Sequence, residues 1–148
     1  MKLSTKGRYA ARAMLELALR NGNGPVLLKD IARVQAISER YLERIMATLA
    51  SRGLVRSLRG QHGGFNLAAP PSEIRLSDIV TAVEGPLAPV ACVDDPTACG
   101  RSGLCVTRTV WTKLKEAAAL VLDSYTLEDL VNMQKDRQKK SCRDMYHI

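Results

Sequence analysis

The sequence predicts a mainly α-helical fold with one small β-hairpin and a long helix toward the C-terminus. Three observations support this. Apolar residues recur at helical spacing along most of the 148 residues, and aromatic residues are scarce. Two strand-like runs flank a glycine-rich turn at 60–64. A long, largely apolar helical pattern covers 107–123.

The first two predicted helices are separated by a clear stop signal. We expect the first over 4–20, with Ser4 or Thr5 as its N-cap. The run NGNGP at 21–25 ends it. A β-like lead-in at 26–28 precedes a short second helix over 28–34, which turns Ile31, Ala32 and Val34 inward.

A tight turn at 35–37 leads into the third helix, over 38–51. Ser38 is its predicted cap. The stripe of this helix has the spacing i, i+3, i+4, i+7 and consists of Leu42, Ile45, Met46 and Leu49. A short helix, a tight turn and a longer helix form the helix-turn-helix arrangement.

The hairpin follows the third helix directly and is expected to act as a wing. Its strands are LVRSLR (54–59) and FNLA (65–68), and GQHGG (60–64) forms the turn between them. Residues 1–84 are therefore predicted to form a winged helix-turn-helix domain, which ends with a short helix over 77–83 capped by Ser77.

The C-terminal half is predicted to hold a loop, two helices and a tail. A cysteine-containing loop covers 85–106, and dimerisation helices cover 107–137. The apolar side of 107–123 is larger than a peripheral helix needs, which favours a dimer interface over ordinary core packing. A further helix starts at Thr126, which pairs with Asp129 in a capping-box-like arrangement, and ends near Lys135. Residues 138–148 are expected to be a mobile charged tail.

The positive charge is concentrated in the first half. Residues 1–64 hold 12 Lys or Arg against 4 Asp or Glu, whereas residues 65–148 hold 10 against 11. This asymmetry is the electrostatic footprint of a nucleic-acid reader. With no apolar run near the roughly 20 residues of a membrane span and no secretory pattern, a cytoplasmic location without membrane association is expected.

The exposed face of the third helix is expected to enter the major groove of double-stranded DNA. Arg40 or Arg44 would read guanine and Glu43 cytosine, although Glu43 has the alternative of pairing with either arginine along the helix. Tyr41 would contact a phosphate or fasten the helix to the core. The full set of DNA-contact candidates is Lys2, Lys6, Arg8, Ser38, Arg40, Tyr41, Glu43, Arg44, Arg56, Arg59, Gly60, His62 and Gly63.

Three cysteines lie within fourteen positions in the predicted loop: Cys92, Cys99 and Cys105. Thiolates are the usual ligands of iron–sulfur clusters and of structural zinc. Gaps of six and five residues suit a loop around a cluster better than the tight pairs of zinc fingers. Arg108 cannot ligate, because a guanidinium stays protonated. The open candidates for a fourth ligand are Asp94, Asp95, Thr107, Cys142, His147 or a residue of a partner chain.

Taken together, these segments resemble the IscR-type iron–sulfur cluster regulators, a family that includes the NsrR-type nitric-oxide sensors. The resemblance rests on MKLSTKGRYAARAMLELAL, ISERYLERIMATLASRGLV, RGQHGGFNLA and SDIVTAVEGP, followed by the cysteine loop in the family order. It implies a homodimer on two DNA half-sites and a 2Fe–2S cluster on Cys92, Cys99 and Cys105. Arg108 stands where the IscR type has a histidine ligand, and Arg8 where the NsrR type has an aspartate.

The expected function is therefore a DNA-binding regulator that senses an iron–sulfur cluster and controls cluster biogenesis genes. It would not be an enzyme and would take no small-molecule substrate. The alternatives are a winged-helix regulator with a zinc or thiol-redox switch at the same cysteines, a nitric-oxide-sensing repressor, a redox carrier, and a protein-interaction module. Only two histidines are present and no nucleotide-binding glycine motif follows a strand, which argues against the enzymatic alternatives.

Overall fold

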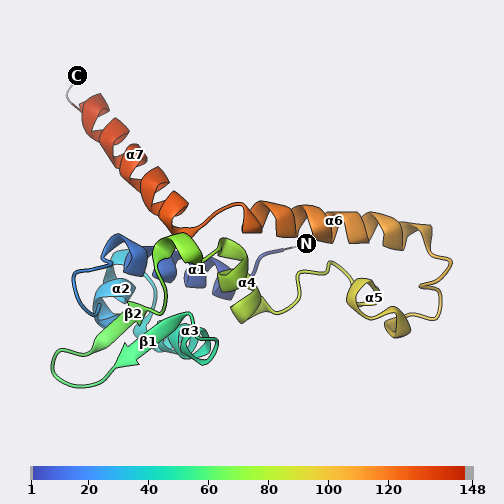
Figure 1. The fold of residues 1–148 in the computed structure, drawn as a ribbon, viewed down its shortest axis with the longest axis horizontal. Helices are drawn as coiled ribbons and strands as arrows, with labels where there is room; N and C mark the ends of the chain where they lie inside the picture. Colours follow the sequence, from blue (N-terminus) through green and yellow to red (C-terminus); the bar gives the residue numbers. More distant parts are fainter. Residues whose placement is uncertain (1, 146–148) are drawn as a thin grey trace.

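The computed structural model describes residues 2–145. Its N-terminal unit consists of α1 (Thr5–Leu19), α2 (Leu28–Gln35), α3 (Glu39–Ser51), β1 (Val55–Leu58), β2 (Gly64–Leu67), a 3-10 turn η1 (Pro71–Glu73) and α4 (Leu76–Glu84). Then follow α5 (Ala91–Asp94), η2 (Pro96–Ala98), α6 (Val106–Asp123) and α7 (Leu127–Met145). This mainly helical architecture with one two-stranded sheet confirms the predicted fold class (Figure 1).

The core lies among α1, α2, α3, α4 and the start of α7. α1 is the central helix and packs against α2, α3, α4 and α7. The predicted stripe of α3 is confirmed, because Leu42, Ile45, Met46 and Leu49 are fully buried. Val34, in contrast, is exposed, which corrects its expected inward position; α2 buries only Ile31 and Ala32.

Two helix caps follow the prediction and one does not. The Ser4 and Ser38 side chains accept hydrogen bonds from the backbone N–H groups of Gly7 and Tyr41. Ser77 is not the cap of α4. That helix begins one residue earlier, and the Asp78 carboxylate accepts a 2.8 Å hydrogen bond from the Arg75 N–H.

The antiparallel hairpin pairs Val55 with Leu67 and Leu58 with Gly64. Val26 adds an isolated bridge to Phe65, so the lead-in to α2 contributes a short third edge. Gly64 has φ +144°, and a Cβ there would lie 2.5 Å from the carbonyl oxygen of Val26. This close approach explains why the strand begins with glycine.

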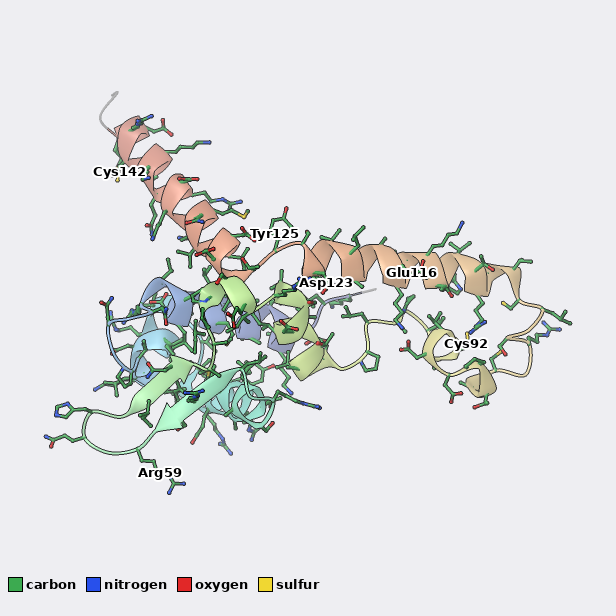
Figure 2. The ribbon with its side chains drawn as sticks, in the orientation of Figure 1. Arg59, Cys92, Glu116, Asp123, Tyr125 and Cys142 are labelled. Carbon is green, nitrogen blue, oxygen red and sulfur yellow. The ribbon has the colours of Figure 1, made fainter. Side chains whose placement is uncertain are left out.

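α6 projects away from the N-terminal unit, and Cys92 lies near its outer end (Figures 1 and 2). The chain then returns, because the Leu76 N–H donates to the Tyr125 oxygen and the Leu127 N–H to the Ile74 oxygen, both at 2.9 Å. The predicted pairing of Thr126 with Asp129 is present at the start of α7, with the Thr126 N–H donating to the Asp129 carboxylate at 2.8 Å.

α7 does not end near Lys135. It continues to Met145, so residues 138–145 are helical rather than the expected mobile tail; His147 lies outside the described residues. Leu127 and Val131 are the residues of α7 that are buried in the core. No helix within residues 2–145 has both the length and the apolar character needed to cross a membrane.

Candidate DNA interface and cysteine loop

Three charged side chains that were predicted to read DNA share one side of α3. Arg40, Glu43 and Arg44 have the spacing i, i+3, i+4, and all three are exposed. Within residues 2–145, Glu43 forms no ion pair with Arg40 or Arg44, so the structure does not support the pairing alternative. The three side chains therefore form an exposed charged surface on α3.

The turn before α3 is held by α1. Ala36 adopts the left-handed conformation with φ +52°, which reverses the chain between α2 and α3. The Arg12 Nε donates to the Gln35 Oε1 at 3.0 Å, and the Gln35 amide donates to the Glu16 carboxylate at 3.1 Å. These polar contacts connect α1 to the last residue of α2, directly before the turn into α3.

Tyr41 is half-buried and its ring meets that of Tyr9 edge-to-face, with 5.9 Å between ring centroids. The Arg12 guanidinium lies over the Tyr9 ring, 5.4 Å from its centroid. Of the two interpretations of Tyr41, the contact that fastens α3 to α1 is present. Ser38 is exposed and combines its capping role with a place at the start of the reading helix.

The hairpin presents Arg56, Arg59, Gly60 and His62 as exposed residues, and Arg59 lies on the loop at its outer end (Figure 2). Gly60 has φ +108°, which favours glycine. Gly63 is buried, and a Cβ there would lie 2.4 Å from the Leu58 oxygen, so this glycine is required by the turn itself.

The three cations at the start of the chain have different environments. Arg8 is exposed and donates to the Thr5 hydroxyl at 3.2 Å, and Lys6 is half-buried. Lys2 precedes α1 and lines a groove between α6 and the segment that follows α4, together with Leu114 and Val121. Lys2 therefore lies beside the long helix rather than on the face that carries Arg40 and Arg44.

The segment Gly85–Cys105, called the cysteine loop below, is more ordered than the sequence suggested. Cys92 lies in the single-turn helix α5, Cys99 follows η2, and Cys105 is the N-cap residue of α6. Cys99 is exposed and the other two thiols are half-buried; all three are free. Within residues 2–145, no three His, Cys, Asp or Glu side chains are gathered closely enough to hold a metal ion.

Two contacts fasten this loop to α6. The Arg108 Nε donates to the Cys92 carbonyl oxygen at 2.7 Å, and Lys115 forms an ion pair with Asp94. Arg108 was set aside at the sequence level as a group that cannot ligate, but it has a structural role that links α6 to the backbone of a cysteine. No local sequence pattern marks this contact, because Arg108 and Cys92 are 16 positions apart.

The environment of Cys105 favours the thiolate. The Thr107 hydroxyl, 3.1 Å from the Cys105 sulfur, lowers the pKa of this thiol, with further lowering by the backbone N–H groups of Arg108 and Thr107 and by the charge of Arg101. Thiolates are the form that binds metals and attacks oxidants.

The candidates for a fourth ligand are unequally placed. Asp94 pairs with Lys115. The Asp95 carboxylate accepts from the Thr97 hydroxyl at 2.6 Å and from the Thr97 N–H at 2.9 Å, and these two hydrogen bonds lower the pKa of Asp95. Thr107 already contacts Cys105. Cys142 is exposed at the far end of α7, on the opposite side of the molecule from Cys92 (Figure 2).

Comparison with known proteins gives one consistent family. Residues 3–133 match the family model Rrf2, described as an iron-dependent transcriptional regulator. The chain is 41% identical over 139 residues to the HTH-type transcriptional regulator CymR of Bacillus subtilis, covering 94% of this chain and 96% of CymR. It is 40% identical to the HTH-type transcriptional regulator IscR of Serratia proteamaculans, covering 97% of this chain and 90% of IscR.

The solved structures agree with this assignment. IscR of T. potens superimposes with a TM-score of 0.77 at 41% identity, over 93% of this chain and 91% of that one. The expectation of a non-enzymatic regulator is confirmed, since these relatives are named as transcriptional regulators. The chain belongs to the Rrf2 family and is a DNA-binding transcriptional regulator with a winged helix-turn-helix fold.

Proposed function

We propose that this regulator binds its operator with an affinity that depends on an iron–sulfur cluster, of the 2Fe–2S type, held by Cys92, Cys99 and Cys105. The observation that carries the proposal is the cysteine loop: three free thiols on a short exposed segment fastened to α6. The family description as iron-dependent supports the choice of iron. We also propose that the regulated genes serve cluster assembly, as the resemblance to IscR-type proteins implies.

The donor set fits such a cluster in its chemistry. Cysteine thiolates are the standard ligands of 2Fe–2S clusters, and Cys105 is biased toward the thiolate by Thr107. A bound cluster would supply a redox- and iron-responsive group. The fourth position stays open in this proposal: Arg108 holds the Cys92 carbonyl, so a carboxylate of the loop or a partner residue would serve.

DNA recognition is assigned to α3 and the hairpin. Arg40, Glu43 and Arg44 would read base edges in the major groove, while Arg56, Arg59 and His62 would contact the backbone or the minor groove. Lys6 and Arg8 would contact phosphates from the first turn of α1. Gly60 is exposed with φ +108° and would let the turn lie against the duplex, whereas Gly63 is buried and its N–H donates to the Gly60 oxygen within the turn.

The regulator is proposed to act as a homodimer formed through α6. No residue of α6 is buried, even though the helix carries large apolar side chains: Leu120 is 73% exposed and Val121 is 58% exposed. A groove of about 600 Å³ runs between α6 and the start of the cysteine loop, with a largely apolar lining. A second copy of α6 would cover this surface and would set the spacing of two half-sites.

The experiment that tests the proposal uses anaerobically prepared protein with and without cluster reconstitution. A duplex is first selected from a randomised DNA library by the wild-type protein, and its Kd is then measured in both states. Cys92→Ala is expected to abolish the visible absorption of the reconstituted protein and the difference between the two Kd values. Unchanged absorption in that variant would contradict the ligand assignment.

A second candidate function is a thiol-redox switch at the same cysteines. It is favoured by the thiolate bias of Cys105, and one relative, CymR, is described as the global cysteine regulator of B. subtilis. Under this alternative, metal-free protein would change its Kd upon treatment with peroxide and recover it with a reductant. Zinc analysis of the same samples tests whether the three cysteines bind zinc instead of a cluster.

A further inference from the structure

Glu84, the last residue of α4, connects two parts of the protein that the sequence keeps far apart. Its Oε1 accepts hydrogen bonds from the Gly7 N–H at 3.0 Å and the Ser4 N–H at 3.2 Å. The Ser4 hydroxyl also bonds to the same oxygen. The carboxylate therefore accepts from the Ser4 N–H and shares the Gly7 N–H with the Ser4 cap, at the start of α1, where the helix dipole favours a negative charge.

The first turn of α1 is shaped around this carboxylate. Gly7 is buried, and a Cβ at this position would lie 2.3 Å from the Glu84 Oε1. Even the smallest side chain would displace the carboxylate. The contact between α4 and α1 thus depends on the carboxylate of Glu84 and on the absence of a side chain at Gly7.

On one side, Glu84 leads directly into the cysteine loop. Gly85 follows with φ +82°, and the chain then runs to α5 and Cys92. The Arg108 guanidinium fastens the Cys92 carbonyl to α6, and α6 itself packs on α4. A change in the position of the loop can therefore affect α4 by two routes. One runs along the chain through Gly85, and the other runs through Arg108 and the contact of α6 with α4.

Farther along α1, side chains contact the recognition helix α3 and the turn that precedes it; α3 and this turn are called the reading head below. Tyr9 meets Tyr41 of α3 edge-to-face, and Arg12 donates to Gln35 at the end of α2. A displacement of the first turn of α1 moves Tyr9 and Arg12 with it, because the helix is a rigid element over so short a distance. Within the described residues, Glu84 is the one side chain that joins the end of α4, where the cysteine loop begins, to the first turn of α1 through hydrogen bonds.

We infer that Glu84 is a positioning residue that transmits the state of the cysteine loop to the recognition helix α3 by holding the first turn of α1. This inference rests on the proposed function, in which the loop is the sensing element. It requires no contact between Glu84 and DNA. It predicts that the loop and the reading head become energetically independent when the Glu84 contact is lost.

The test is a double-mutant cycle on metal-free, thiol-reduced, full-length protein. Arg108→Ala releases the Cys92 carbonyl and so perturbs the loop without removing a cysteine. Binding to the selected duplex is measured for wild type, R108A, E84A and the double variant. We expect R108A to change Kd about fivefold or more in the wild-type background and less than about twofold in the E84A background. The same fold-change in both backgrounds, or none in either, would overturn the inference.

Three further variants separate positioning from general stability. Glu84→Gln keeps an oxygen acceptor at the same place and should restore the R108A effect. Asp78→Asn removes a capping carboxylate within the same helix, 2.8 Å from its partner N–H, and should leave the R108A effect intact. Gly7→Ala displaces the Glu84 carboxylate while favouring the helix, so it replaces E84A if that variant does not fold.

The cluster itself supplies a separate readout. In wild type, the ratio of Kd values between cluster-loaded and cluster-free protein tests the proposed function, and E84A should bring that ratio close to one. Equal Kd values in wild type would refute cluster sensing, while the mutant cycle on metal-free protein would still decide the role of Glu84.

Discussion

Replacing Glu16 with alanine should destabilise the N-terminal unit and weaken DNA binding. Glu16 is only 5% exposed, and it is the one charged residue among the buried residues described. Its two carboxylate oxygens accept from the Arg20 Nε at 2.7 Å and from the Gln35 amide at 3.1 Å. Since Gln35 precedes the turn into α3, this carboxylate supports the geometry of the reading helix.

The size of the effect follows from these two hydrogen bonds. A hydrogen bond to a charged group contributes about 1.5–3 kcal/mol. The Arg20 side chain is 35% exposed, so water replaces its lost partner. We therefore expect a loss of about 2 kcal/mol in the free energy of unfolding, below the roughly 3–5 kcal/mol for breaking a fully buried pair. For a chain of this size, Tm should fall by about 4–8 °C.

Urea denaturation followed by circular dichroism measures this loss directly. Arg33→Ala is the matched control, because Arg33 faces Asp30 at 3.8 Å on the surface and its side chain is 74% exposed. That control should change the free energy of unfolding by less than about 0.5 kcal/mol. If Glu16→Ala were equally mild, the argument that this buried network holds the helix-turn-helix would be wrong.

Three other predictions test the cysteine loop, the wing and α6. Thr107→Val removes the largest cause of the lowered pKa of Cys105, so the pH midpoint of Cys105 alkylation should move upward; an unmoved midpoint would refute the role of the hydroxyl. Arg59→Ala should weaken binding to the selected duplex and reduce the magnitude of the salt slope by about one, and unaltered affinity across salt would remove the wing from the interface. Val121→Glu should convert a dimer to a monomer in light scattering, whereas Glu116→Lys, on another side of α6, should not; a dimer in both would contradict the proposed interface.

Much of the helix-turn-helix could be predicted from the sequence, because periodicity and capping residues act locally. The stripe of α3 and the Ser4 and Ser38 caps are read from neighbouring residues alone, and the structure confirms them. The glycine-rich turn marked the hairpin for the same reason. The exposure of Val34 was not predictable in this way, since α2 packs through Ile31 and Ala32 and its other side faces solvent.

The predicted ends of α4 and α7 differ from the structure for separate physical reasons. At α4, the Asp78 carboxylate reaches back to the Arg75 N–H and takes the capping role expected of Ser77. At α7, the charged composition suggested a tail, but no glycine or proline interrupts Leu127–Met145 and its Lys, Arg and Gln residues are good helix formers. In the cysteine loop, Asp95 caps a 3-10 turn that starts with Pro96.

The contacts that connect α1, α4, α6 and the cysteine loop could not be predicted from the sequence. Glu84 and Gly7 are 77 positions apart, and Arg108 meets a backbone oxygen 16 positions away. No local pattern marks such pairs, because they depend on how α1, α4 and α6 are packed together. The cysteine spacing pointed to a shared ligand set, but it carried no information on the short helices that separate the thiols.

The most direct test of the central claim is the absorption spectrum of anaerobically prepared protein, measured with iron and acid-labile sulfide on the same sample. The account predicts broad visible absorption with iron and sulfide in equal amounts, near two of each per chain for a 2Fe–2S cluster. A colourless protein after anaerobic reconstitution, with zinc or no metal, would contradict cluster sensing and leave the thiol or zinc switch at Cys92, Cys99 and Cys105.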